Sequence, residues 1–350
     1  MSATNNPTIL VTGGSGFLGQ RIVQELLDKT SPFQGANICI FDIKKYPGKL
    51  SEKVQFIEGD VSKYEDVKNA CKGKDIVIHS AAIVDWGTKS EEEVYAVNVT
   101  GTENIIKACR ENKVPFMVYT SSLDAVYGGK PLINIDESVA YPEKHATSYC
   151  RSKYLSEKLV LAANSEELKT LVLRPSDIYG EADPYHIDSL IDMAKGGFYV
   201  RLGDGKSSCQ HVYVGNMAYA HVLAADALMK GKKVDGNVYF ITDGKGSNFF
   251  KFFDQVVVGA GYKIWPKNVW IPRGLAYSMG AISESVAVLA RPFKKYTPKF
   301  SRFAVTYTCT DFTFTAEKAK KDLGFQPKYD LETALKNTIA FYREQRLNGK

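Results

Sequence analysis

The chain has 350 residues, 44% of them hydrophobic, and a formal net charge of +6 at pH 7. These values are ordinary for a globular protein with a large core, and they exclude a disordered or fibrous chain. The six cysteines lie without C-x-x-C spacing and the five histidines are scattered, which argues against a disulfide framework and a metal site. The first seven residues lack the charged start and apolar stretch of a secretory signal, so we expect a cytoplasmic protein.

The first predicted element is an apolar strand at 8–12, followed by a glycine-rich turn and an amphipathic helix over 17–29. The turn carries the spacing G-x-x-G-x-x-G, at Gly13, Gly16 and Gly19. Glycines at such a turn let the backbone approach a dinucleotide pyrophosphate, and the helix N-terminus offers N–H groups to the phosphates. The next strand, 37–41, leads into Asp42, at the spacing of a carboxylate that binds the adenine-side ribose. This pattern predicts dinucleotide binding.

Strands and amphipathic helices continue to alternate through the first half of the chain. Further strands are predicted at 54–57, 75–79, 116–120 and 170–173, and further helices at 63–71, 91–112 and 149–163. The alternation predicts an α/β fold, a doubly wound parallel sheet of the Rossmann type with helices on both faces. Ligands of such sheets bind beyond the carboxyl ends of the strands.

The regular alternation of strands and helices becomes less regular after Arg174-Pro175. This change predicts a smaller mixed substrate lobe. We assign 8–179 to the dinucleotide-binding domain, with pieces that return to the sheet near 211–241, at His211–Val214 and Val238–Ile241. The substrate lobe then comprises 180–210 and 242–345.

Three polar residues follow the pattern of a proton relay. The strand at 116–120 leads into Ser122, and Tyr149 follows with Lys153 one helical turn later on the same face. A tyrosine with a pKa of about 10 is a poor base, but a neighbouring ammonium group and a cationic nicotinamide favour its phenolate form. The serine can hold the reacting oxygen while a hydride moves to the cofactor. These residues predict alcohol–ketone interconversion, with Ser121 as the alternative serine if the strand ends one residue earlier.

The Tyr-x-x-x-Lys pattern by itself is not specific, because the chain holds three copies of it. These are Tyr64/Lys68, Tyr149/Lys153 and Tyr154/Lys158. The first lies on a helix expected to be a solvated face, and Tyr154 is five residues from Tyr149, so it points in a different direction on the same helix. We therefore interpret the first and third copies as unrelated to catalysis.

Together these residues resemble the extended short-chain dehydrogenase/reductase superfamily, and the chain is similar to the 3β-hydroxysteroid dehydrogenase family along almost its whole length. Matching stretches include FLGQRIV (17–23), LRPSDIYGE (173–181) and HVYVGNMAYAHVLA (211–224). The resemblance implies NAD-dependent oxidation of a 3β-hydroxyl on a steroid or sterol to the 3-ketone. It implies a small lipophilic alcohol as partner and no nucleic acid, and it leaves a homodimer open.

The resemblance also implies roles for individual residues. Tyr149 would be the acid/base, Lys153 its electrostatic partner and Ser122 the donor to the substrate oxygen, while Asn98 is a weaker candidate for the relay. The cofactor would be held by Tyr149, Lys153 and the residues Gly13, Gly16, Phe17, Leu18, Gly19, Asp42, Asp60, Val61, Ala81 and Ala82. Asp42 would favour NAD over NADP by repelling a 2′-phosphate.

The segment Ser247–Asp254 departs from the family's pattern. Bifunctional members also move a ring double bond with a tyrosine and an acid in this region, whereas this segment reads Ser-Asn-Phe-Phe-Lys-Phe-Phe-Asp. We therefore expect no isomerase activity. Three alternatives remain open: a sterol 4-carboxylate 3-dehydrogenase that decarboxylates, a nucleotide-sugar epimerase or dehydratase, and a redox sensor that binds the dinucleotide without turnover.

The basicity of the chain is confined to residues 263–302, where eight Lys and Arg face a single acid, Glu284, giving +7. Within this segment 274–290 is too polar to span a bilayer but carries one apolar helical stripe. The stripe comprises Leu275, Met279, Ile282, Val286 and Leu289. We predict a helix that packs on the substrate lobe as a lid. The alternative is peripheral docking on an anionic intracellular membrane.

Overall fold

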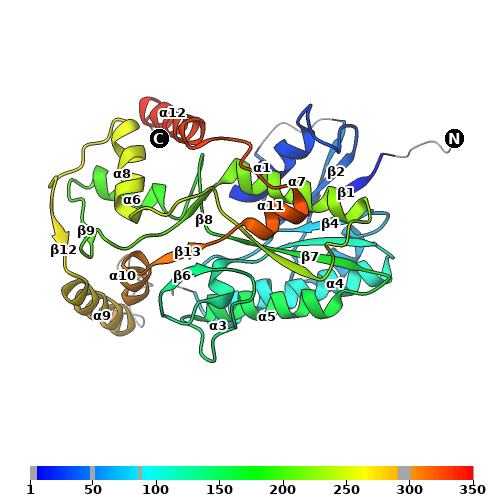
Figure 1. Ribbon diagram of the computed structural model, residues 1–350, viewed down its shortest axis with the longest axis horizontal. Coiled ribbons are helices and arrows are strands. Elements are labelled where there is room, and N and C mark those ends of the chain that lie inside the picture. Colours follow the sequence, from blue (N-terminus) through cyan, green and yellow to red (C-terminus); the bar gives the residue numbers. More distant parts are fainter. Residues whose placement is uncertain (1–5, 48–51, 86–88, 291–300, 350) are drawn as a thin grey trace.

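The computed structural model describes residues 6–47, 52–85, 89–290 and 301–349 (Figure 1). Its centre is a seven-stranded parallel sheet with the order β11-β7-β5-β4-β1-β2-β3. The strands are β1 (Thr8–Thr12), β2 (Asn37–Asp42), β3 (Val54–Glu58), β4 (Ile76–His79), β5 (Phe116–Thr120), β7 (Lys169–Pro175) and β11 (Asn237–Ile241). The order reverses between β1 and β4, which is where doubly wound sheets open a crevice for ligands. The predicted fold class is confirmed.

The strands form because their apolar runs are buried on both faces of the sheet. In β1 the alternating side chains Ile9 and Val11 join one hydrophobic cluster and Leu10 joins another. Parallel strands covered on both faces read as continuous hydrophobic runs rather than alternating ones. The register aligns Thr12 with Phe41 of β2 and with His79 of β4, so the carboxyl ends of these strands meet at one edge.

Helices cover the sheet on both sides (Figure 1). One face is covered by α1 (Phe17–Leu27), α7 (Val214–Met229) and α11 (Glu317–Leu323). The other is covered by α2 (Tyr64–Ala70), α4 (Gly101–Glu111) and α5 (Ser148–Ala163). Between β4 and α4 lie α3 (Glu91–Tyr95) and a π-helical turn, η1 (Ala96–Thr100).

The rest of the chain builds an aromatic-rich lobe beside the sheet. Its helices are α6 (Ile187–Lys195), α8 (Phe249–Gly259), α9 (Arg273–Ala290), α10 (Arg302–Thr308) and α12 (Leu331–Leu347). Its strands form three parallel pairs: β8 (Asp177–Tyr179) with β10 (His211–Tyr213), β9 (Arg201–Leu202) with β12 (Trp270–Ile271), and β6 (Leu132–Ile135) with β13 (Phe312–Phe314). A third hydrophobic cluster joins these elements.

Of the two segments expected to return to the main sheet, one does so. Val238–Ile241 lies within β11, which pairs with β7. The prediction for His211–Val214 is wrong, because β10 pairs with β8 outside the seven-stranded sheet. The predicted boundary between the two domains stays a prediction.

The predicted helix over 274–290 is present as α9, but the prediction that its apolar stripe packs as a lid is wrong. All five stripe residues are exposed, from 42% at Met279 to 75% at Leu289. The helix instead meets α10 through small residues, since a Cβ on Gly280 would lie 2.8 Å from the backbone nitrogen of Arg302. Among the described residues, no helix combines the length and the apolarity that crossing a bilayer requires.

Candidate active site and dinucleotide cleft

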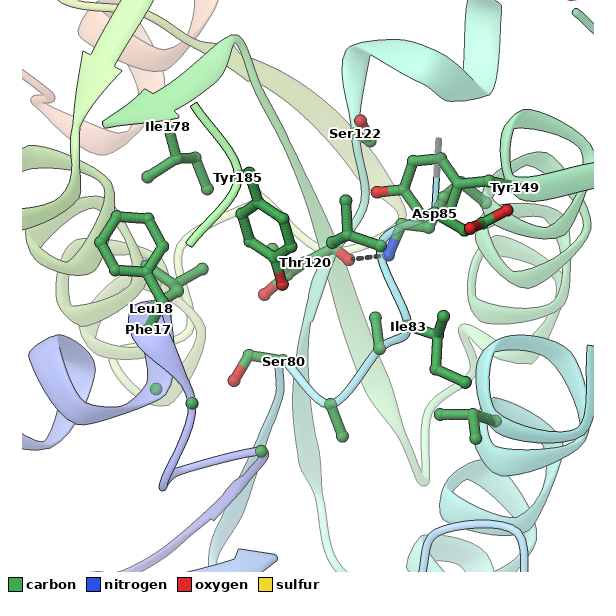
Figure 2. A pocket seen from close by; sticks show the side chains of 18 of the residues that line it. Phe17, Leu18, Ser80, Ile83, Asp85, Thr120, Ser122, Tyr149, Ile178 and Tyr185 are labelled. Atoms are coloured by element: carbon green, nitrogen blue, oxygen red, sulfur yellow. Dashed lines mark hydrogen bonds between the residues drawn. The ribbon is translucent and has the colours of Figure 1, made fainter. Parts of the chain in front are cut away.

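A cavity of about 650 Å³ opens beyond the carboxyl ends of the central strands. All the predicted catalytic and cofactor-binding residues line it: Gly13, Gly16, Phe17, Leu18, Gly19, Asp42, Asp60, Val61, Ala81, Ala82, Ser122, Tyr149 and Lys153. Figure 2 shows Ser122 and Tyr149 on one side of this pocket, facing Phe17, Ile178 and Tyr185 on the other. The structure thus brings the predicted residues together, while their individual roles stay predictions.

The glycine-rich turn leaves room for a ligand because its backbone is packed without side chains. Gly13 has φ +68°, a left-handed conformation that favours glycine, and a Cβ there would lie 2.7 Å from the Cα of Ala81. A Cβ on Gly19 would overlap the carbonyl oxygen of Gly13. Gly16 is the N-cap of α1 and supplies no side-chain cap, so the N–H groups of this helix end meet the cavity. The turn therefore fits a pyrophosphate.

Asp42 is held in place at the end of β2. One of its carboxylate oxygens accepts from the Ser15 backbone N–H and the other from that of Lys44, both at 3.0 Å. Each oxygen has a second lone pair, so a ribose diol can still donate to this carboxylate. Asp60 is fixed in a similar way by the backbone N–H and hydroxyl of Ser62. The donors and acceptors of this end of the cavity fit a dinucleotide.

Tyr149 and Lys153 project into the cavity from the first turns of α5. Thr147 caps this helix by accepting from the Cys150 N–H at 3.1 Å, which sets where the helix begins. Both side chains are buried, with exposures of 7% for Tyr149 and 3% for Lys153. The ammonium group of Lys153 donates to the carbonyl oxygen of Thr120 at 2.7 Å, the bond drawn in Figure 2.

Ser122 lies at the start of a short 3₁₀ turn, η2 (Leu123–Val126), that follows β5. Its hydroxyl donates to Asp124 Oδ2 at 2.7 Å and accepts from the Asp124 backbone N–H at 3.1 Å. The Ser122 side chain also acts to lower the pKa of the Tyr149 hydroxyl. Ser121 lines the cavity as well, but its hydroxyl donates to Glu157, which forms a buried ion pair with Arg174. The geometry therefore favours Ser122 over Ser121 as the partner of Tyr149.

Burial sets the charges of these groups. It lowers the pKa of Lys153 to about 7, opposed by the carboxylates of Glu157 and Asp124. It raises the pKa of Asp124 to about 6. Burial, together with the charge of Asp124, raises the pKa of the Tyr149 hydroxyl well above its ordinary value. Without a further positive charge nearby, Tyr149 is a neutral phenol at pH 7.

The other two Tyr-x-x-x-Lys copies do not line the cavity. Tyr154 packs against Tyr141 and His145, with ring centroids 4.8 and 4.7 Å away. Tyr64 lies under the ammonium group of Lys107, 4.0 Å from the ring centroid.

Asn98 does not line the cavity but holds one of its walls. Its amide bonds both backbone groups of Ile83, at 2.8 and 3.0 Å, and donates to Ser152 Oγ at 2.9 Å. The residue sits on η1, and π-helical turns of this kind are frequent at functional sites. Asn98 thereby ties the loop after β4 to α5.

Several cavity residues were missed from the sequence. Asp124 follows Ser122 closely, and Asp177 lies within the matching stretch 173–181, so both carried a signal. Tyr307 carried none: its hydroxyl reaches Asp177 at 2.6 Å from a helix 130 residues away in the chain. Ile178, Tyr185, Phe303 and Tyr307 make this part of the cavity, the aromatic end, rich in aromatic and apolar side chains, with Asp124 and Asp177 among them.

Asp177, Cys209 and His211 have potential ligand atoms within 4.8 Å of one another. Their surroundings disfavour a cation, because burial raises the pKa values of Asp177 and Cys209 and so favours their protonated forms, which are poor metal ligands. The His211 ring stacks on Phe252 at 4.3 Å, and Asp177 accepts from Tyr307. Asp177 alone of the three lines the cavity, and we interpret the other two as packing behind it.

Asp254, the acid of the segment 247–254, is engaged elsewhere. It accepts from the Tyr199 hydroxyl at 2.9 Å and from the Arg201 guanidinium at 2.8 Å. Neither Asp254 nor the phenylalanines before it line the cavity.

The Rossmann sheet, the glycine turn and the Tyr149/Lys153 pair define a dinucleotide-binding protein of the short-chain dehydrogenase/reductase type. Residues 10–271 match the model of the 3-beta hydroxysteroid dehydrogenase/isomerase family, and the chain belongs to this family. The family prediction is confirmed.

The curated relatives that match nearly the whole chain include two of different names. Sterol-4-alpha-carboxylate 3-dehydrogenase (decarboxylating) of Schizosaccharomyces pombe is 35% identical over 94% of this chain and 95% of its own length. Short-chain dehydrogenase/reductase family 42E member 1 of Mus musculus is 35% identical over 93% of this chain and 85% of its own length. Among solved structures, an epimerase of Methanothermobacter thermautotrophicus has a TM-score of 0.77 at 19% identity, covering 98% of this chain and 94% of its own. At that identity the likeness establishes the fold alone.

Proposed function

We propose that the protein is an NAD-dependent oxidoreductase that oxidises the 3β-hydroxyl of a steroid or sterol to the 3-ketone. The observation that carries this is the meeting of Ser122, Tyr149 and Lys153 in one cavity, between a glycine-rich dinucleotide turn and an aromatic wall. The wall suits a rigid apolar substrate, since such sites bind mainly through hydrophobic contact and few polar groups. Family membership supports the substrate class.

NAD would lie with its pyrophosphate on the N-terminus of α1 and its adenine-side ribose on Asp42. Asp60 and Val61 line the adenine end, while Ala81 and Ala82 line the path toward Tyr149. When bound, NAD accepts the hydride that leaves C3 of the substrate. The positive charge of a bound nicotinamide would oppose the burial that raises the pKa of Tyr149.

In this mechanism Tyr149 removes the proton of the substrate hydroxyl as the carbonyl forms. Lys153, fixed by the Thr120 carbonyl, supplies the positive charge that favours the tyrosine anion. Ser122 holds the substrate oxygen. Asp124 orients the Ser122 hydroxyl by accepting a hydrogen bond from it or, when Asp124 is protonated, by donating one to it. Asn98 acts as a positioning residue by holding the loop at Ile83.

A second candidate substrate is a sterol that bears a 4-carboxylate. Oxidation at C3 places the new ketone β to this carboxylate, so the C4–carboxylate bond can break, carbon dioxide leaves, and the electron pair moves toward the ketone oxygen. Tyr149 and Ser122 are placed to stabilise the charge on that oxygen. The relatives of Schizosaccharomyces pombe and Candida albicans, named for this reaction, are 35% and 34% identical to the chain and favour the candidate.

Two further alternatives have less support. The described cavity wall contains lysines but no arginine, the residue best suited to clamp the diphosphate of a nucleotide sugar. A dinucleotide sensor without turnover has no use for the buried Tyr149/Lys153 pair. The engagement of Asp254 by Tyr199 and Arg201 supports a dehydrogenase without isomerase activity.

A substrate panel tests the proposal. The purified chain would be given NAD or NADP with a 3β-hydroxy-Δ5-steroid, a 4α-carboxysterol or a UDP-sugar, while reduced nicotinamide and product mass are followed. We expect NAD reduction with the first or second substrate, an unconjugated Δ5-ketone at early times, and loss of carbon dioxide from the carboxysterol. Turnover of the UDP-sugar alone would overturn the proposal. Tyr149→Phe serves as the inactive control.

A further inference from the structure

Two acidic side chains lie together at the aromatic end of the cavity. Asp124 and Asp177 both line it, and they are only 8% and 7% exposed. They come from different segments, since Asp124 lies on η2 after β5 and Asp177 begins β8. Burial raises the pKa of Asp124, and the charge of the nearby Asp177 adds to this effect. Two carboxyl groups in an apolar pocket make it sensitive to the charge of what binds there.

Cations do not fully balance these acids. The groups that face Asp124 from other elements are Tyr149, Cys150 and Lys153 of α5, Asp177 of β8 and Tyr307 of α10. Lys153 is the cation among them, and its ammonium group donates to the Thr120 carbonyl oxygen. Asp177 also interacts with His186, but the charge of a protonated His186 is matched by Asp183, 3.3 Å away. Within this group of side chains, carboxyl groups therefore outnumber cations.

The position of the reacting oxygen determines which part of a substrate meets Asp124. In the proposed mechanism Ser122 holds the oxygen on C3, and the Ser122 hydroxyl lies 2.7 Å from Asp124 Oδ2. C4 is bonded directly to C3, so a carboxylate on C4 lies within a few bond lengths of the same oxygen. A 4-carboxylate would therefore lie close to the Asp124 carboxylate, where like charges repel strongly because little water separates them.

We propose that Asp124 and Asp177 act as a charge filter that selects substrates without an anionic group beside the carbon that is oxidised. The favoured substrate is then an uncharged 3β-hydroxysteroid, and the 4-carboxysterol is the disfavoured one of the two candidates. The charge filter rests on the proposed function, because that function places C3 of the substrate at Ser122. Asp124 then has two effects: it orients the Ser122 hydroxyl and it repels an anion next to the reacting oxygen.

The strength of the charge filter has an upper limit, because Asp124 can avoid the repulsion by taking up a proton. Its pKa is about 6, so protonation at pH 8 costs a factor of about 100, which is tenfold for each pH unit. We therefore expect Asp124 to disfavour the carboxysterol by about ten- to a hundredfold at pH 8. The effect of Asp177 should be smaller, because Asp177 does not bind the serine that holds the substrate oxygen.

Steady-state kinetics with NAD at pH 8 tests the charge filter. The probes are two 3β-hydroxysterols that differ only at C4, one with a 4α-methyl group and one with a 4α-carboxylate. The measured quantity is the ratio of kcat/KM for the carboxysterol to that for the methyl sterol. Asp124→Asn should raise this ratio about ten- to a hundredfold, and Asp177→Asn about two- to fivefold. A general loss of turnover through a disturbed Ser122 cancels in the ratio, since both sterols lose the same hydride.

The matched control is Asp226→Asn, which removes a carboxylate from α7 outside the cavity, where Asp226 pairs with Lys230. It should leave the ratio within twofold of wild type. Circular dichroism and melting would verify that each variant folds. If Asp124→Asn does not fold, Asp177→Asn decides alone, because its amide oxygen can still accept from Tyr307.

The outcomes separate the charge filter from the proposed function. A ratio that neither variant raises would overturn the charge filter and leave the proposed function intact. The same holds if wild type oxidises the carboxysterol as efficiently as the methyl sterol. Oxidation of neither sterol by wild type would overturn the proposed function, and the charge filter with it.

Discussion

The two ends of the cavity are built from different parts of the polypeptide. At the glycine-turn end the backbone makes the surface: Gly13 and Gly19 pack without side chains, and α1 presents bare N–H groups. At the aromatic end side chains make it, through the Tyr307–Asp177 and Ser122–Asp124 hydrogen bonds. A surface made of backbone groups does not titrate, and it recognises the pyrophosphate that all dinucleotides share. A side-chain surface can be tuned in charge and shape, so the substrate and its proton are controlled there.

The largest effect is expected at the aromatic end, from the variant Tyr149→Phe. Because the hydroxyl that moves the proton is removed while the glycine turn is untouched, turnover should fall by about 10²–10⁴-fold with NAD affinity retained. Steady-state kinetics and NAD titration would measure the two quantities. Tyr154→Phe, which lies outside the cavity, is the control and should keep nearly full turnover. Normal turnover by Tyr149→Phe would remove Tyr149 from the mechanism.

The variant Asp124→Asn tests whether the Asp124 carboxyl group at the aromatic end titrates between pH 4 and pH 7. The pKa of Asp124 is raised by burial from 3.8 to about 6, so its native state holds the proton more tightly than the unfolded chain does. This contribution to stability is fully present below pH 3.8 and is lost as the pH rises through 6, by about 3 kcal/mol in all. The amide that replaces the carboxyl group in Asp124→Asn does not titrate, so the variant carries no such loss.

Urea unfolding of both proteins between pH 4 and pH 7 would measure this contribution. The free energy of unfolding of Asp124→Asn minus that of wild type should increase as the pH rises. This difference isolates Asp124, because all other groups titrate in both proteins. A difference that is constant with pH would show that Asp124 does not titrate in this range.

The same contrast between backbone and side chains explains what the sequence could predict. Strands β1 to β5 were located within about a residue, because parallel strands buried on both faces are unbroken apolar runs. The glycine turn, Asp42 and the Tyr149/Lys153 pair were found because short local spacing specifies them. Tyr307 and the clamp of Asn98 on Ile83 could not be found, since they arise only when distant segments pack.

Two errors of prediction have related causes. His211–Val214 has a strand's apolar pattern, but such a pattern does not specify its partner, and the strand pairs with β8. For α9 the apolar periodicity correctly predicted a helix, but the prediction that the apolar side packs on the substrate lobe was wrong. Small residues such as Ala276 and Gly280 allow the close helix contact, which leaves the large apolar side chains outside. A hydrophobic period identifies a face without stating what covers it.

A smaller effect is expected from Gly19→Ala at the backbone end. The added Cβ would overlap the Gly13 carbonyl oxygen, so the turn must shift, at a cost of about 1–3 kcal/mol. NAD affinity should therefore fall by roughly ten- to a hundredfold, with lower thermal stability. Calorimetric titration and melting would measure both. Gly274→Ala, where a Cβ would meet open space, is the control. Unchanged NAD affinity in Gly19→Ala would show that the turn does not seat the cofactor.

The smallest effect is expected from Asp42, the side chain at the glycine-turn end that we propose to select NAD over NADP. Asp42 is fixed by the N–H groups of Ser15 and Lys44, so its carboxylate can accept from the ribose diol of NAD and repel the 2′-phosphate of NADP. In Asp42→Ala the hydrogen bonds and the repulsion are both lost, and Lys44 and Lys45 remain nearby. The ratio of kcat/KM for NAD to that for NADP should fall about tenfold, as loss of one charged hydrogen bond implies. Kinetics with both cofactors would measure it, with Lys44→Ala as the control that moves the ratio the other way. If wild type already uses both cofactors equally, Asp42 does not select the cofactor, and the glycine-turn end recognises only what NAD and NADP have in common.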